Sequence, residues 1–348
     1  MSLTISESSA PDSSWDVLAR ERGLFYHQPR WISVLAEAHS YPLICLTARE
    51  EGRTVGFLSV AEVPPLLGPR RLVSLPFSYA AGPLAENAEI ADQLMQRARE
   101  MAQDRRVGRL EIKQREPLSA VPSAGLVRVQ HYSSYVLETE GGESAVMERL
   151  HPGSTRRGIR KGEKEGVLVA RGSSEPEWLE MARLEEATAH RHGVPAPPRR
   201  FFLGACRALQ RDGLADLYLA RLRSGGVAAG IVIWKGPREW IYAYGASRPE
   251  SLPFRPNHML LWTAIQDAIA SRVKFDFGRA APEQHGLVEF KLRWGGQPVP
   301  LSYDYWPSAG GLNVADRSRG PLALAARLWS RLPARVTRGG SFLYRYLG

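Results

Sequence analysis

The sequence has little cysteine and no long apolar run, and both absences narrow its class. Cys45 and Cys206 are the only cysteines in 348 residues, too few for a disulfide framework and typical of a reducing compartment. The longest apolar stretch, residues 227–234, is far shorter than the roughly 20 residues that span a membrane. Residues 1–15 lack the basic and apolar segments of a signal peptide. We therefore expect a soluble, cytoplasmic protein.

The overall composition is that of ordinary globular domains. Hydrophobic residues make up 44% of the chain and charged residues 24%. These proportions exclude a disordered or collagen-like chain. The length predicts two domains.

Positive charge is concentrated in two segments. The formal net charge is +10. Residues 149–171 hold seven Lys or Arg against two acids, and residues 317–348 hold seven Arg and no acid. Because the rest of the chain is close to neutral, the pattern favours local anionic partners. A solvated basic surface is the alternative for either segment.

One pattern of strands occurs twice. Residues 43–60 and 217–233 each contain two apolar runs joined by a glycine-containing turn, which predicts a β-hairpin. Each hairpin is followed by a short strand that starts at a tyrosine, at 79–82 and at 242–245. The match predicts an internal duplication.

A helix and a further strand complete each copy. Apolar residues recur at helical spacing in 88–103 and in 257–271, and the strands 110–112 and 275–277 follow. Each half is then a mixed α/β unit of the kind seen in GNAT-type acyltransferases. The predicted fold is α/β, with two tandem GNAT-like units and a basic C-terminal extension. The expected divisions are a flexible N-terminus (1–24), a first unit (25–130), a second unit carrying the site (131–309) and a basic amphipathic extension (310–348).

The second half carries several short motifs in a fixed order. The first is a basic helix at 155–167. Four segments with His, aromatic residues and Arg or Lys follow it, at 190–195, 256–258, 275–279 and 290–295. As an ordered set they resemble FemAB-like (Fem-type) peptidoglycan aminoacyltransferases, and most closely the exosortase- and exopolysaccharide-associated branch. The resemblance covers roughly residues 25–305. No heptad run of the length of a coiled-coil arm is present, so the chain resembles the armless members.

The resemblance implies acyl transfer from an activated donor to an amine. The implied partners are aminoacyl-tRNA or an acyl thioester donor, and a phosphate-containing cell-wall or exopolysaccharide precursor. No cofactor is implied, and His190 and His192 lack a third ligand at the spacing of a zinc site. Two alternatives stay open: an acyl-CoA- or acyl-carrier-dependent N-acyltransferase, and a non-catalytic glycan-precursor binding protein.

Lys291 is the first candidate catalytic residue. An amine that attacks an ester passes through a tetrahedral oxyanion, which a fixed cation stabilises. The pair Phe290–Lys291 resembles the family's Phe-Lys pair, whose lysine is assigned this role, and Trp294 follows in the same motif as a substrate-binding candidate. A surface lysine with its stem along apolar neighbours is the alternative.

Asp276 is the second catalytic candidate. A carboxylate inside the apolar strand 273–277 needs a partner if it is buried. Arg279, three residues on, is the expected partner. Either the two form a structural ion pair, or Asp276 positions or deprotonates the attacking amine while Arg279 orients a substrate anion.

Further candidates concern substrate binding. Arg157 and Lys161 share one face of the predicted helix and Arg160 lies on the adjacent face, a row that suits phosphates; an exposed helix balanced by Glu163 and Glu165 is the alternative. Tyr244 lines either a cleft or the core.

Two more candidates stand at the start of the predicted helix 257–271. Asn257 and His258 follow a segment with two prolines and no glycine, which argues against a pyrophosphate-binding loop for coenzyme A. Asn257 is alternatively the helix N-cap.

The tail completes the list of candidates. Residues 321–332 predict a basic amphipathic helix that either packs on the body or lies on an anionic membrane. Contact of residues 321–348 with the membrane would place the protein at the inner face of the cell membrane.

Overall fold

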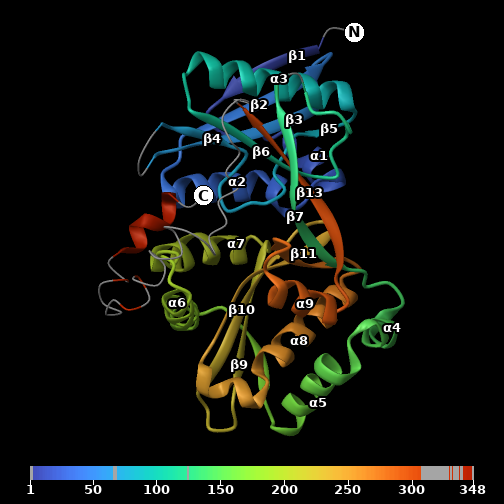
Figure 1. Ribbon diagram of the computed structural model, residues 1–348, viewed down its shortest axis with the longest axis vertical. Coiled ribbons are helices and arrows are strands. Elements are labelled where there is room, and N and C mark those ends of the chain that lie inside the picture. The colour runs from blue at the N-terminus through green and yellow to red at the C-terminus, as the bar shows by residue number, and fades with distance from the viewer. Residues whose placement is uncertain are drawn as a thin grey trace.

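The computed structural model describes residues 3–65, 69–123, 125–306, 329, 331, 337 and 340–346. Its described strands form one mixed sheet of 13 strands. The first unit lies at one end of the molecule and the second at the other, and β13 and β7 run between them (Figure 1). The order along the sheet is β1-β2-β3-β4-β6-β13-β7-β12-β11-β10-β9-β8, with β5 beside β3.

The first unit contains the predicted hairpin and helix. Its strands are β1 (Leu3–Ser8), β2 (Leu43–Glu50), β3 (Arg53–Val63), β4 (Arg71–Val73), β5 (Leu84–Ala85) and β6 (Arg109–Arg115), and its helices are α1 (Trp15–Arg22), the 3-10 helix η1 (Phe25–His27), α2 (Pro29–His39) and α3 (Ala88–Asp104). Helix α3 begins where the Asn87 side chain accepts a hydrogen bond from the Ile90 N–H at 3.0 Å. Its apolar face, with Leu94 and Met101, is buried against β2 and β3.

Residues 3–24 differ from the flexible segment that the sequence predicts for residues 1–24. Strand β1 pairs antiparallel with β2 along its whole length. Trp15 is fully buried, and its ring stacks on Phe57 at 4.2 Å. Stacking and burial of two large aromatic rings hold this segment on the sheet.

The second unit has the same arrangement with more helices. Its strands are β7 (Val127–Leu137), β8 (Leu168–Gly172), β9 (Ala215–Arg221), β10 (Val227–Lys235), β11 (Glu239–Ser247), β12 (Lys274–Ala280) and β13 (Gln297–Trp306). Its helices are α4 (Gly142–Arg149), α5 (Arg157–Lys164), α6 (Glu175–Arg191), α7 (Arg207–Arg211), α8 (Pro256–Ala270) and α9 (His285–Arg293), with short helical segments η2 (Pro152–Arg156), η3 (Phe201–Cys206) and η4 (Pro249–Phe254).

The duplication is visible as one parallel strand pair in each unit. Strands β4 and β6 pair in parallel in the first unit, and β11 and β12 in the second, with α3 and α8 as the crossover helices. One detail of the sequence analysis is wrong. The first unit's strand is Arg71–Val73, and residues 79–82 form a loop between β4 and β5.

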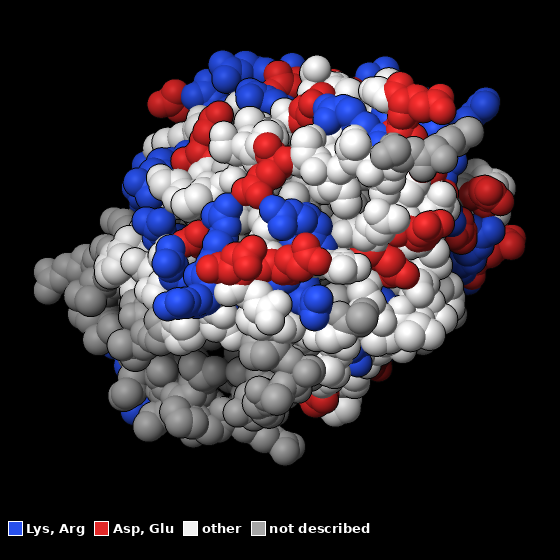
Figure 2. All heavy atoms as spheres, turned by 90° about the horizontal axis from the view of Figure 1, so that it is seen from above, with Lys and Arg blue, Asp and Glu red and all other residues white. Residues whose placement is uncertain are grey.

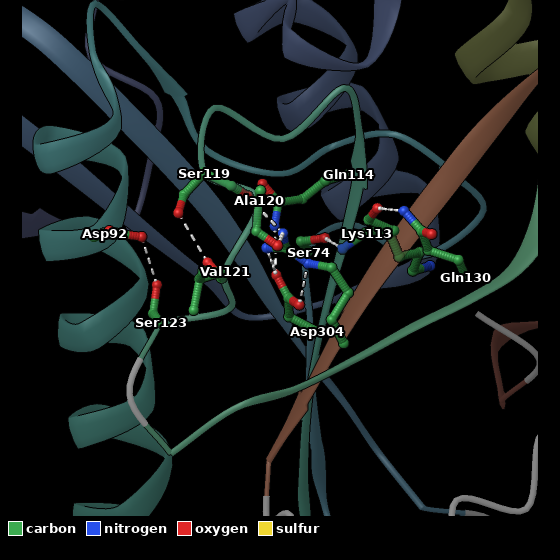
Figure 3. A network of polar contacts seen from close by, with 12 residues as sticks. Ser74, Asp92, Lys113, Gln114, Ser119, Ala120, Val121, Ser123, Gln130 and Asp304 are labelled. Carbon is green, nitrogen blue, oxygen red and sulfur yellow. Dashed lines mark hydrogen bonds and ion pairs between the residues drawn. The ribbon is translucent and has the colours of Figure 1, made fainter.

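The two units share a sheet and a core. Strand β13, the last described strand, lies between β6 of the first unit and β7 of the second. Its buried Asp304 accepts hydrogen bonds from Arg128 of β7, both at 2.8 Å, and from Gln114 of β6 (Figure 3). Phe25 of the first unit also stacks on Trp234 of the second, at 5.3 Å. The two units therefore pack as one body.

The C-terminal extension lies mainly outside the described residues, and so does the predicted helix 321–332. The described segment η5 (Gly340–Tyr346) packs on the first unit, where the Tyr344 ring stacks on Phe77 at 4.3 Å. Among the residues that the structure describes, no helix is both long and apolar enough to cross a bilayer. Basic and acidic side chains are interspersed on the end of the molecule formed by the first unit (Figure 2).

Candidate active site

The parallel strands β11 and β12 open away from each other in the second unit. They pair only from Glu239 to Ile241 and from Lys274 to Asp276. Directly beyond this point each strand bulges. In β11, Ile233 faces Tyr242 and Val232 faces Tyr244, so Ala243 is an extra residue; in β12 the register shifts between Asp276 and Arg279. Bulges leave main-chain groups outside the ladder, and side chains can then bind these groups.

Gly278 forms the bulge of β12. Its φ of +78° lies in the left-handed region, and a Cβ there would lie 3.6 Å from the Tyr242 carbonyl oxygen. A side chain at this position would strain the backbone and fill the space between the strands. The glycine keeps the opening clear.

Asp276 is fully buried, and its carboxylate holds this bulge. One oxygen, Oδ1, accepts the Gly278 N–H at 2.7 Å. The other, Oδ2, accepts the Tyr79 hydroxyl at 2.7 Å and an N–H of Arg115 at 3.2 Å. Burial raises the pKa of Asp276, and Arg115 acts in the opposite direction.

The predicted pairing of Asp276 with Arg279 is wrong. Arg279 instead donates to the Tyr303 hydroxyl at 3.0 Å, and its guanidinium lies 4.4 Å from the centre of the Tyr132 ring. The bulge is the physical reason, because an extra residue between the two positions re-aims the second side chain.

Arg115 forms ion pairs with two buried carboxylates. It donates to both oxygens of Glu239, at 3.0 and 2.7 Å, and also reaches Asp276. Burial, with the neighbouring Asp276 charge, raises the pKa of Glu239 to about 7. Because Arg115 and Tyr79 belong to the first unit, the first unit stabilises the strand ends of the second.

Lys291 reaches the same bulge from α9. It is 2% exposed, and its Nζ donates to the carbonyl oxygens of Gly278 at 2.7 Å and Arg279 at 2.9 Å. The ammonium also lies 5.3 Å from the centre of the Tyr135 ring. Burial lowers the pKa of Lys291 to about 8, so the side chain is still mainly charged at neutral pH.

The aromatic candidates beside Lys291 have different surroundings. Trp294 is 1% exposed and packs between Phe277 and His258, whereas Phe290 is half-buried at its edge. Of the two, Phe290 is the one that a substrate can touch, and Trp294 supports the α9 end of the site.

The start of α8 adjoins α5. A Cβ at Gly158 would lie 2.2 Å from the His258 ring, so the two helices approach very closely here. His258 is therefore packed between helices, and burial lowers its pKa to about 4. The helix N-cap is Arg255, not Asn257, whose side-chain nitrogen lies 3.4 Å from the Ser247 hydroxyl oxygen.

The basic helix faces solvent, as the anion-binding interpretation requires. Gly158 and Gly162 turn toward α8, which leaves Arg157, Arg160 and Lys161 exposed on the outer side of α5. Within the described part of the chain, none of these three side chains forms an ion pair, not even with an acid of its own helix.

Tyr244 packs in an aromatic cluster on the other face of the sheet. Its ring contacts Phe202 and Trp234, and its hydroxyl lies 3.3 Å from that of Tyr344. The core alternative from the sequence describes this residue better than the cleft alternative.

A cavity of about 720 Å³ lies near the end of β11. Helix α6, the chain around Arg199 and the segment Ser247–Glu250 line it, together with Trp329 and Thr337 of the tail. Lys291 is not among its lining residues. The crevice that the sequence predicts at Lys291 is therefore not this cavity, and it stays a prediction.

The equivalent position in the first unit is closed. Beyond the paired part of β4 and β6, the Ser74 hydroxyl oxygen accepts the Lys113 N–H at 2.8 Å, as Figure 3 shows. The Lys113 Nζ donates to the Leu75 carbonyl oxygen at 3.2 Å. These bonds bridge the two strands, so the second unit has the more open pair.

The sequence analysis did not identify four residues of the site, which are Tyr79, Arg115, Tyr135 and Glu239. They come from distant parts of the chain, and no local motif marks them. The one available signal was the duplication, which put Tyr79 and Tyr242 at matching places without indicating that Tyr79 reaches the other unit. Among the described residues no three His, Cys, Asp or Glu side chains gather as metal ligands.

Residues 152–292 match the acetyltransferase (GNAT) domain family. No curated protein sequence matches the chain. Among solved structures, FemX has a TM-score of 0.68 at 16% identity, over 86% of this chain and 96% of that chain. L-PGS from Bacillus licheniformis has a TM-score of 0.57 at 13% identity, over 95% of this chain and 98% of that chain.

A further structure repeats the two-unit arrangement. The tandem GNAT protein from the clavulanic acid biosynthesis pathway has a TM-score of 0.53 at 13% identity, over 89% of this chain and all of that chain. Residues 152–292 thus carry an acetyltransferase domain of the GNAT type, in a chain whose fold is that of FemX and of the tandem GNAT protein.

Proposed function

We propose that this chain is a Fem-type acyltransferase that moves an aminoacyl or acyl group from an activated ester or thioester to an amine. The acceptor is a cell-wall or exopolysaccharide precursor. The opening between β11 and β12, beside the buried cation Lys291, is the observation that carries this proposal. A GNAT domain over the same residues supports it.

The proposed chemistry needs positioning more than a cofactor. The donor carbonyl lies in the opening, the acceptor nitrogen attacks its carbon, and the oxygen gains negative charge. Two Lys291 N–H groups are held by main-chain carbonyls, which fixes the ammonium beside the bulge of β12. A cation fixed in this way stabilises an oxyanion that forms next to it.

An ester donor fits the start of α8 better than coenzyme A. Pro253 and Pro256 have no N–H, and the N–H groups of Ser251, Arg255 and His258 are already donated to carbonyl oxygens. Few donors are left for a pyrophosphate. This feature supports aminoacyl-tRNA over acyl-CoA.

The exposed row on α5 supports a phosphate-bearing substrate. Arg157, Arg160 and Lys161 suit either an RNA backbone or a pyrophosphate-linked precursor. If the precursor is lipid-linked, the basic sequence 321–348 supports contact with an anionic membrane at its inner face.

A transfer assay tests the proposal. The protein is incubated with a UDP-linked muramoyl pentapeptide as amine acceptor and with one of three donors: tRNA charged with ¹⁴C-amino acids, ¹⁴C-acetyl-CoA or ¹⁴C-acyl carrier protein. We expect a base-stable labelled amide from charged tRNA. Label from a thioester alone favours the acyl-CoA or carrier-dependent alternative, and no label from any donor contradicts acyl transfer.

A further inference from the structure

A loop of the first unit reaches the candidate active site of the second. Residues 74–83 connect β4 to β5, and Tyr79 lies in the middle of this loop. A Cβ at Gly278, in the bulge of β12, would lie 4.0 Å from the Tyr79 ring. The first unit therefore packs directly against the bulge that the Lys291 ammonium contacts from the second unit.

The backbone of this loop is strained. Leu75 and Phe77 each have a φ of +57°, in the left-handed region that residues other than glycine seldom adopt. The Trp31 Nε1 donates to the Ser78 hydroxyl oxygen at 3.1 Å, which anchors the loop on α2. Strain of this kind persists only where the surrounding structure holds it, and it is concentrated at functional sites. The strained loop delivers Tyr79 to the other unit.

Three hydrogen bonds connect Tyr79 with Lys291. The Tyr79 hydroxyl donates to Asp276 Oδ2 at 2.7 Å. The other oxygen of Asp276 accepts the Gly278 N–H at 2.7 Å, and the Gly278 carbonyl oxygen accepts the Lys291 Nζ at 2.7 Å. Tyr79 is 9% exposed, Asp276 0% and Lys291 2%, so little water competes with these bonds. The position of the ammonium thus depends on a hydroxyl of the first unit.

We propose that Tyr79 is a positioning residue of the candidate active site, an inference that rests on the proposed acyl transfer. Its hydroxyl fixes Asp276, and Asp276 fixes the bulge at Gly278. The bulge carries the carbonyl oxygens that hold the Lys291 ammonium. Tyr79 touches no reacting atom. Because a small displacement of a catalytic group lowers the rate strongly, the first unit contributes to the chemistry of the second.

Tyr79 and Arg115 have different roles at Asp276. Arg115 donates to both oxygens of Glu239 as well as to Asp276, so its loss leaves two buried carboxylates without a cation. The change Tyr79→Phe removes one hydroxyl and leaves Arg115 in place. Its effect on transfer can therefore be separated from a general loss of stability.

The protonation of Lys291 gives a second readout. Burial lowers the pKa of Lys291 to about 8, against the opposing effect of Asp276. Burial raises the pKa of Asp276, and Arg115 and the Tyr79 hydroxyl act in the opposite direction. Without this hydroxyl, Asp276 binds a proton more readily, and less negative charge then supports the ammonium. The titratable and charged groups that face Asp276 or Lys291 are Arg279 of β12, Tyr135 of β7, Glu239 of β11, Arg115 of β6, and Tyr79 and Tyr26 of the first unit.

The test compares Tyr79→Phe with wild type in the transfer assay above, with the donor that wild type uses. Tyr218→Phe is the matched control, because the Tyr218 hydroxyl also donates to a carboxylate, that of Asp267, at 2.7 Å. Tyr218 lies on β9, which β10 separates from β11. We expect kcat to fall by about 10-fold in Tyr79→Phe with KM unchanged, since the lost bond is one to a charged group. The control should behave as wild type.

The dependence of the rate on pH should change as well. Transfer needs the charged form of Lys291, so the wild-type rate should fall as the pH rises through about 8. In Tyr79→Phe this fall should occur at lower pH, and in Tyr218→Phe at the wild-type pH.

A double variant shows whether Tyr79 acts through Asp276. Asp276→Asn keeps the shape of the side chain and removes its charge. In that background, Tyr79→Phe should lower kcat by less than about twofold, because the bond that it breaks no longer holds a carboxylate. Effects of the two changes that multiply would mean that Tyr79 does not act through Asp276, and would overturn the proposal.

The remaining outcomes separate this proposal from the proposed function. Equal kcat for Tyr79→Phe and wild type, or a fall in kcat without a change in its pH dependence, overturns the positioning role and leaves acyl transfer standing. No transfer by the wild-type chain with any of the three donors overturns both. A Tyr79→Phe chain that unfolds, as followed by circular dichroism, also contradicts the proposal, because it would mean that the hydroxyl holds the fold.

Discussion

At the scale of single residues, the site depends on charges whose partners are distant in sequence. Sequence reasoning found Asp276 and Lys291, because a carboxylate in an apolar strand and a lysine after an aromatic are unusual. It did not find Arg115 or Tyr79, which lie more than 150 residues from Asp276 in the chain. Local spacing predicts only local partners, and here a bulge directs Arg279 elsewhere.

Replacing Arg115 should destabilise the protein strongly. Arg115→Leu leaves Asp276 and Glu239 buried without their cation, at a cost of about 3–5 kcal/mol. The pKa of Glu239 is already raised, and loss of Arg115 raises it further. Both carboxyl groups are then protonated at low pH, so the destabilisation should be larger at pH 8 than at pH 5.

Urea unfolding at the two pH values measures this effect. Arg53→Leu, which breaks an exposed ion pair with Glu86, is the control and should change the unfolding free energy far less than Arg115→Leu. If the two variants lose equally little unfolding free energy, Arg115 does not neutralise the buried carboxylates of Asp276 and Glu239.

Removing the Glu185 charge should stabilise the protein at alkaline pH. The pKa of this carboxyl is raised to about 7 by burial, above its unfolded value, so its charged form opposes folding. The penalty is absent below the unfolded pKa, near 4, and is complete above about pH 7. The melting temperature of Glu185→Gln should therefore exceed that of wild type at pH 8 and approach it at pH 4.5. A variant less stable than wild type at pH 8 would reveal a partner for this carboxylate.

At the scale of elements, hydrophobic periodicity was a good guide. It predicted α3 and α8 to within a residue or two, because each buries one continuous apolar face. It placed a strand at 79–82 where the chain is a buried loop, since burial on all sides gives the same apolar composition. The helices α1, α2, α7 and α9 were not predicted at all.

The α5 row should bind its ligand electrostatically. Lys161→Glu reverses one of three adjacent exposed cations, so affinity for charged tRNA should fall, and the loss should shrink as salt is raised from 0.05 to about 0.3 M. Filter binding at several salt concentrations measures this. Arg211→Glu, an exposed arginine on α7, is the control. Equal affinities of wild type and Lys161→Glu for charged tRNA at low salt would contradict the proposal that this row binds phosphates.

At the scale of the whole molecule, the duplication was predictable but its asymmetry was not. Repeated hairpins and helices in the sequence predict two units. The sequence does not indicate that β13 crosses to the first unit, or that Ser74 and Lys113 close the first unit's strand pair. These features depend on register and on contacts between distant segments, which periodicity does not encode.

The two buried lysines provide a direct comparison of the two units. Lys113 and Lys291 both donate to main-chain carbonyl oxygens, and burial lowers the pKa of each to about 8. The decisive measurement is the single-turnover rate of label transfer from charged tRNA by Lys113→Ala and Lys291→Ala, per folded protein. Loss of an oxyanion donor predicts a fall of about 10²–10³-fold for Lys291→Ala, and a rate within about twofold of wild type for Lys113→Ala. Equal rates for the two variants would contradict an active site between β11 and β12.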